Sequence, residues 1–194
     1  MALLAVVALT TLAANGAARL RSMSVALLAV SIAADVIAAG ATTPGQLAVL
    51  AAAGIAAAGI LFVAARDGHY GEDPAWRVWV ATLIAAVATP VAWISFRSLT
   101  PEAPDIPLVG GDPGNVIVQV AAFWLLSSGT AILITARHAV RTTLGALLML
   151  TGVQLLIRLA PGPQIELTVA VAWLEVIVAL TGAFLIVNER ALRE

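Results

Sequence analysis

Seven long apolar runs, separated by short polar segments, constrain this chain more than any other feature of its sequence. The runs cover residues 2–18, 23–40, 46–65, 78–96, 115–136, 142–159 and 164–187. Each approaches the roughly 20 residues that an α-helix needs to cross a bilayer core of about 30 Å. Backbone polar groups in lipid must be hydrogen-bonded within their own segment, so such runs form helices. The pattern predicts an all-α transmembrane bundle of about seven spans.

Composition supports a membrane location and excludes several classes of function. Hydrophobic residues make up 61% of the 194 residues and charged residues only 11%, more apolar surface than an aqueous fold can bury. We therefore expect a multi-pass protein of the cell inner (cytoplasmic) membrane, with the lipid bilayer as its first partner. The net charge of -1 offers no basic patch, so nucleic acid is not an expected partner. Cysteine is absent, which excludes thiolate chemistry and disulfides.

Arginine placement predicts the orientation, because short cytoplasmic loops retain positive charge. With seven spans, eight arginines fall on one side and two on the other. This asymmetry places the N-terminus outside and the C-terminus in the cytoplasm. The larger group is Arg19, Arg21, Arg66, Arg77, Arg137, Arg141, Arg190 and Arg193, and the smaller one is Arg97 and Arg158.

The chain divides into two helical regions around one long break. Residues 1–99 form an N-terminal four-helix region, 100–115 an extracytoplasmic loop rich in Pro and Gly, and 116–194 a three-helix region. A faint echo relates 18–35 to 139–155, in which Ala26-Leu27-Leu28 meets Ala146-Leu147-Leu148. Two parallel three-helix units joined by the fourth span would produce it, and so would shared membrane composition.

Glu175 is the strongest functional candidate, because an ionisable group inside a membrane span is costly and usually serves a function. It lies near the middle of the last run, and Thr168, Ala172, Ala179 and Gly182 share its helical face. This stripe of small residues should pack on other helices, so Glu175 should face protein. It is either a group that binds and releases a proton or a hydrogen-bonded structural carboxyl.

Three other spans carry weaker polar signals. Asp35 near the outer end of the second run either joins a proton path or reaches headgroup water. Gln154 and Arg158 lie four residues apart on one face of the sixth run, and Arg158 is expected to extend to the headgroups. Polar residues of the fifth run are interpreted as contacts between helices rather than a hydrated path; they are Gln119, Ser127, Ser128 and Thr130.

Cofactor and metal motifs are missing from the sequence. His69 and His138 lie in polar turns without a second ligand type at a useful spacing. There is no phosphate loop, nucleophile elbow or metalloprotease helix. No cofactor, metal or catalytic residue is therefore predicted.

The C-terminal third resembles a known family. Residues 122–152 (AFWLLSSGTAILITARHAVRTTLGALLMLTG) and 171–193 (VAWLEVIVALTGAFLIVNERALR) are similar to the K subunit of bacterial complex I. The shared features are a basic turn between the first two spans and a carboxylate in the third, here Glu175. With its N-terminal extension the whole chain resembles component E of hydrogenase-4. Family charges expected at 147–150 and near Ala53 are absent here.

The resemblance implies a non-catalytic subunit of a complex I-like or group 4 hydrogenase-like oxidoreductase that translocates protons or sodium. Other membrane subunits, including antiporter-like ones, would be its partners. Whether the chain belongs to an enzyme depends on that assembly. Glu175, Gln154 and Asp35 are the candidates for the ion path. The alternatives are a free-standing transporter or channel for ions or small solutes, and a subunit of a cation antiporter.

Overall fold

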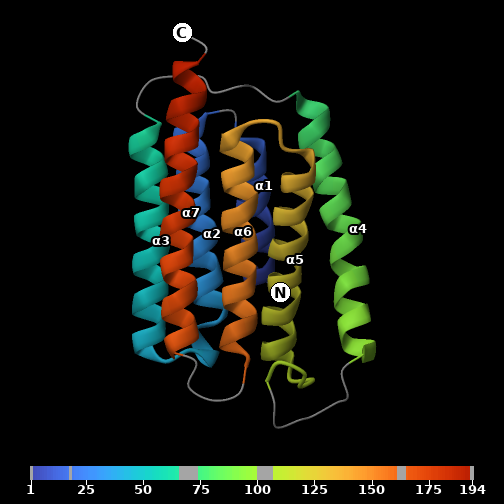
Figure 1. The fold of residues 1–194 in the computed structure, drawn as a ribbon. Coiled ribbons are helices and arrows are strands. Elements are labelled where there is room, and N and C mark those ends of the chain that lie inside the picture. The colour runs from blue at the N-terminus through green and yellow to red at the C-terminus, as the bar shows by residue number, and fades with distance from the viewer. Residues whose placement is uncertain (1, 18, 66–73, 100–106, 161–164, 193–194) are drawn as a thin grey trace.

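A computed structural model describes residues 2–17, 19–65, 74–99, 107–160 and 165–192, and these form an all-helical bundle (Figure 1). The prediction of an all-α fold is confirmed, with seven α-helices in the described part of the chain. A short 3₁₀ turn, Ala39–Ala41, joins the second helix to the third. The α-helices are α1 (Ala2–Gly16), α2 (Leu20–Ile37), α3 (Pro44–Ala64), α4 (Ala75–Leu99), α5 (Pro113–Thr135), α6 (Ala139–Arg158) and α7 (Ile165–Ala191).

Six of these helices are long and apolar enough to cross a membrane, and the seventh is shorter. The 15 residues of α1 would extend about 22 Å at 1.5 Å per residue, less than a bilayer core of roughly 30 Å. The protein is therefore a multi-pass helical membrane protein. The expectation of a seventh span rests on α1.

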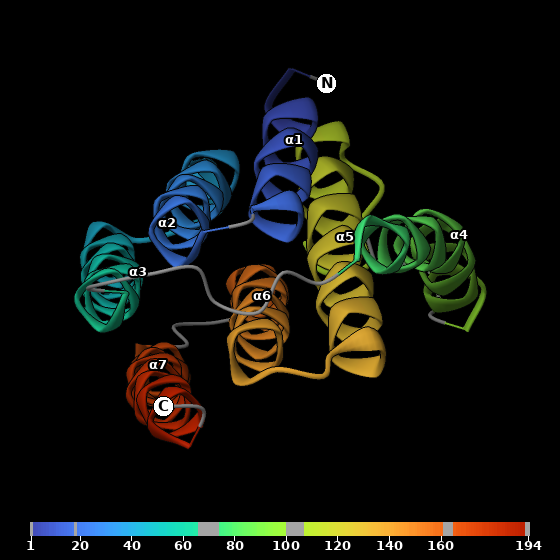
Figure 2. The same ribbon diagram turned by 90° about the horizontal axis from the view of Figure 1, so that it is seen from above.

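Helices distant in sequence pack side by side. Apart from neighbours in the chain, α3 packs most extensively on α7, while α6 also contacts α2 and α5 also contacts α1. Viewed along the bundle, α6 lies between α5 and α7, and α4 lies at one side against α5 (Figure 2). Each helix of α1–α3 thus touches its counterpart in α5–α7. Two three-helix units joined by α4 would give this arrangement, and that explanation of the sequence echo stays a hypothesis.

Two helices begin at proline, where the missing N–H costs nothing. Thr43 and Gln46 form a reciprocal capping box before α3. Asp112 caps α5 by accepting a hydrogen bond from the backbone N–H of Gly114. Because Pro is tolerated in the first turn, α5 starts at Pro113, inside the segment predicted as loop. Residues 100–106 of that loop lie outside the described part.

Glycines bring α5 and α6 into close contact. A Cβ atom added to Gly129 would lie 2.6 Å from the backbone oxygen of Gly145, and one added to Gly145 would lie 2.8 Å from the backbone oxygen of Gly129. Because neither Gly129 nor Gly145 has a side chain, the backbones of α5 and α6 can approach each other closely at these two positions. This contact positions α6, which carries Gln154 and Arg158, in the middle of the bundle.

Candidate functional site

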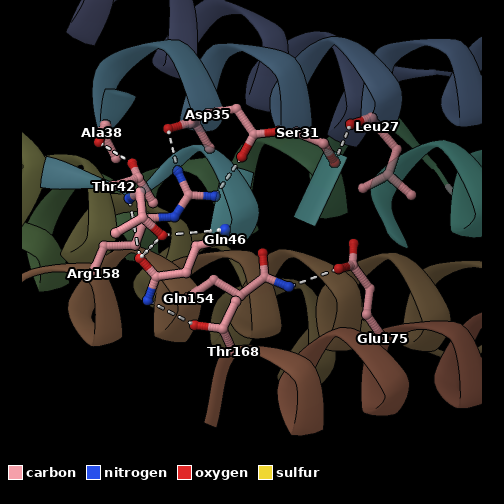
Figure 3. A network of polar contacts seen from close by, with 12 residues as sticks. Leu27, Ser31, Asp35, Ala38, Thr42, Gln46, Gln154, Arg158, Thr168 and Glu175 are labelled. Atoms are coloured by element: carbon pink, nitrogen blue, oxygen red, sulfur yellow. Dashed lines mark hydrogen bonds and ion pairs between the residues drawn. The ribbon is translucent and has the colours of Figure 1, made fainter. Parts of the chain in front are cut away.

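A buried ion pair joins α2 to α6 near one end of the bundle (Figure 3). Asp35 lies two residues before the end of α2, and Arg158 is the last residue of α6. The Arg158 Nη2 donates to Asp35 Oδ1, and Nη1 donates to the backbone oxygen of Ala34 at 3.3 Å. The Arg158 side chain is 1% exposed and that of Asp35 15%.

The expectation that Arg158 extends to the headgroups is therefore wrong. A guanidinium group can be buried when an opposite charge and a carbonyl oxygen accept its hydrogen bonds. Asp35 and Ala34 provide both on the neighbouring helix. The carboxylate of Asp35 points at Arg158 (Figure 3), and the part of Asp35 in an ion path stays a prediction.

Glu175 is buried and hydrogen-bonded one turn further into the bundle. Its side chain is almost fully buried in the packed interface, as the small-residue face of α7 predicted; Thr168, Ala172, Ala179 and Gly182 are buried as well. The amide Nε2 of Gln154 donates to Glu175 Oε2 at 2.7 Å. Gln154 precedes Arg158 by four residues, or about 6 Å along α6, so the two interactions follow each other along one helix face.

A third contact ties α3 to α7 beside this network. Gln46 donates through Nε2 to Thr168 Oγ1 at 3.4 Å, while its Oε1 accepts from the backbone N–H of Thr43 at 3.1 Å. Thr168 lies two turns before Glu175 on the same face of α7. Gln46 of the capping box therefore also links α3 to the face of α7 that carries Glu175.

The three residues predicted for an ion path, Glu175, Gln154 and Asp35, are thus brought together by α7, α6 and α2. Glu175 lies in the same polar network as Asp35 and Arg158 (Figure 3). The latter two balance one another's charge, whereas the hydrogen-bond partner of Glu175 is a neutral amide. Within the described residues, no three side chains of His, Cys, Asp or Glu gather as a metal site would require.

Sequence reasoning missed the roles of Arg158 and Gln46. A signal for Arg158 was present, because Asp35 and Arg158 carry opposite charge near the same predicted face of the membrane in two different spans. Gln46 gave a signal only for capping, as the third residue after Thr43. Its second contact, with Thr168 on α7, depends on the pairing of α3 with α7.

Comparison with protein families, curated proteins and solved structures found no match for this chain. The fold and the buried polar network define it as a multi-pass helical membrane protein with a carboxyl group buried between its helices.

Proposed function

We propose that this protein is a non-catalytic membrane subunit of a complex I-like or group 4 hydrogenase-like assembly, in which Glu175 relays protons. The observation that supports this most directly is the polar network of α2, α6 and α7. It leads from the Asp35–Arg158 pair at the helix ends to a carboxyl buried ten residues into α7. Uncompensated polar groups are costly in lipid, which is why such networks commonly mark ion pathways.

The network also bears on the missing family charges. The carboxylate expected on α6 has no counterpart, since Leu147 and Leu148 are buried apolar residues. Ala53, where the resemblance implies a lysine, packs on α7. Asp35 brings a carboxylate from α2 to Arg158 of α6 instead, four residues along that helix from Gln154, the hydrogen-bond partner of Glu175. A relay of two carboxylates around Arg158 remains available to the chain.

The proposed relay extends from the ends of α2 and α6 only as far as Glu175. A partner subunit is therefore expected to continue the path across the rest of the membrane. We expect purified chain alone in liposomes to conduct few protons, as measured by quenching of a pH-sensitive dye. Proton flux comparable to that of a known channel, and abolished in Glu175→Gln, would favour the free-standing channel. Affinity purification from the native membrane should instead yield large antiporter-like subunits together with this chain.

The decisive variant is Glu175→Gln in the assembled complex. Gln preserves the volume and hydrogen-bonding capacity of a protonated Glu but cannot ionise. We expect normal assembly with pumping per transferred electron reduced several-fold, and partial pumping in Glu175→Asp. The matched control is Glu166→Gln, an exposed carboxylate in the first turn of the same helix, which should pump normally. Normal pumping in an assembled Glu175→Gln complex would remove Glu175 from the path. Replacing sodium with choline in the buffer distinguishes the two ions.

We further propose that the bundle is oriented with the N-terminus outside and the C-terminus in the cytoplasm, from the eight-to-two arginine asymmetry. A reporter enzyme that is active only outside the cytoplasm should be inactive when fused after residue 194 and active when fused after residue 105. Activity at the C-terminus would overturn this orientation. Accessibility of an N-terminal tag from the outside would establish α1 as the seventh span.

A further inference from the structure

A second polar region lies where α1, α4 and α5 meet, away from the Asp35–Arg158 pair. Asn15 is the penultimate residue of α1, and its amide Nδ2 donates to Val78 O at 3.3 Å and Thr82 Oγ1 at 3.1 Å, near the start of α4. The ion pair, in contrast, joins the far ends of α2 and α6. In this antiparallel bundle the two polar regions therefore lie at opposite ends (Figure 1).

A small cavity opens beside Asn15 between these helices. Its polar lining comes from Thr11, Asn15, Thr82, Trp124 and Ser128, and apolar side chains close the remainder. The cavity offers about 10 Å³ to the centre of a water-sized sphere. One water molecule requires about that much space.

Three of the lining residues each carry a buried side-chain atom that has no hydrogen-bond partner among the described residues. They are Asn15 Oδ1, Trp124 Nε1 and Ser128 Oγ. The orientation of the Asn15 amide is fixed, because only its NH₂ group can donate to the carbonyl oxygen of Val78. Buried polar atoms are almost always hydrogen-bonded, so three orphans around one cavity indicate a missing partner.

The three atoms together specify what that partner is. Asn15 Oδ1 requires a donor, the indole N–H of Trp124 requires an acceptor, and the Ser128 hydroxyl serves as either. A metal cation accepts no hydrogen bond and would meet the positive end of the indole N–H dipole. Water is both donor and acceptor and has the right size. We infer that one ordered water molecule occupies this cavity and hydrogen-bonds Asn15, Trp124 and Ser128.

This water would connect helices that otherwise share few polar contacts. Asn15 already binds α4 through its side chain, and its backbone oxygen accepts from Arg141 Nη2 of α6 at 2.8 Å. The water extends this group of contacts to α5 through Trp124 and Ser128. Ser128, interpreted from the sequence as a direct contact between helices, thus acts through the water. The inference is independent of the proton relay at Glu175.

The test combines a direct and an energetic measurement on the full chain in lipid nanodiscs. A structure at about 2 Å resolution should show a density peak within roughly 2.7 to 3.2 Å of all three atoms. A double-mutant cycle of Trp124→Phe and Ser128→Ala, read as shifts in Tm, should be clearly non-additive, because either change alone loses the shared water. The control cycle replaces Ser128→Ala by Ser127→Ala, a buried neighbour that does not line the cavity, and should be additive.

Two results would overturn the inference. One is an empty cavity at that resolution together with additive Tm shifts in the Trp124 and Ser128 cycle. The other is a Tm of the wild-type protein that falls when sodium and potassium are replaced by choline, while the Tm of Asn15→Leu does not respond to this exchange. That result would assign the cavity to a cation.

Discussion

Replacing Arg158 with Met is expected to destabilise the folded bundle by about 3 to 5 kcal/mol, the usual cost of removing one partner of a buried ion pair. The loss arises because Asp35 remains as an unpaired carboxylate between α2 and α6. The measurement is the free energy of unfolding in mixed micelles as the fraction of a denaturing detergent is raised. Arg137→Met, at an exposed arginine of the α5–α6 turn, should change it by less than about 0.5 kcal/mol.

A second substitution, Asp35→Leu, should restore the stability that Arg158→Met removes. Replacing both members of a buried pair by apolar residues is often neutral or stabilising. We therefore expect the double variant to unfold close to wild type while losing the polar link to Glu175. A double variant as unstable as Arg158→Met alone would show that Arg158 acts by some contact other than its pair with Asp35.

Gly129→Ala is expected to destabilise the protein by about 1 to 3 kcal/mol, the typical cost of overpacking. The new Cβ would lie 2.6 Å from Gly145 O and 2.8 Å from the backbone nitrogen of Met149. Backbone atoms cannot rotate away as a side chain can, so α5 and α6 must separate. Thermal unfolding in detergent micelles, followed by helical circular dichroism, measures the effect.

A Gly→Ala substitution on α3, in contrast, should not destabilise the protein. A Cβ atom added to Gly59 of α3 meets nothing within 4 Å, and Ala exceeds Gly in helix propensity by about 1 kcal/mol. Gly59→Ala should therefore be neutral or slightly stabilising. Equal Tm values for Gly129→Ala and Gly59→Ala would contradict the close approach of α5 and α6.

Much of the candidate site follows from local sequence patterns. The burial of Glu175 was predicted from the small residues at helical spacing on its face, because a stripe of Ala, Gly and Thr packs on protein rather than lipid. The common face of Gln154 and Arg158 follows from their spacing of four residues. Neither pattern says which helix is opposite. The hydrogen bond from Gln154 to Glu175 and the pairing of Arg158 with Asp35 could not be derived from spacing.

The sequence by itself determined the class of structure, since apolar runs of membrane-spanning length can satisfy their backbone only as helices. It also determined which face of α7 is buried. The tertiary structure decided the partners, because lipid is as apolar as most of these helix surfaces and hydrophobicity alone does not select one neighbour over another. The selection rests on a few contacts between distant residues: Gly129 against Gly145, Gln46 with Thr168, and Arg158 with Asp35. These contacts bring α2, α6 and α7 together around Glu175.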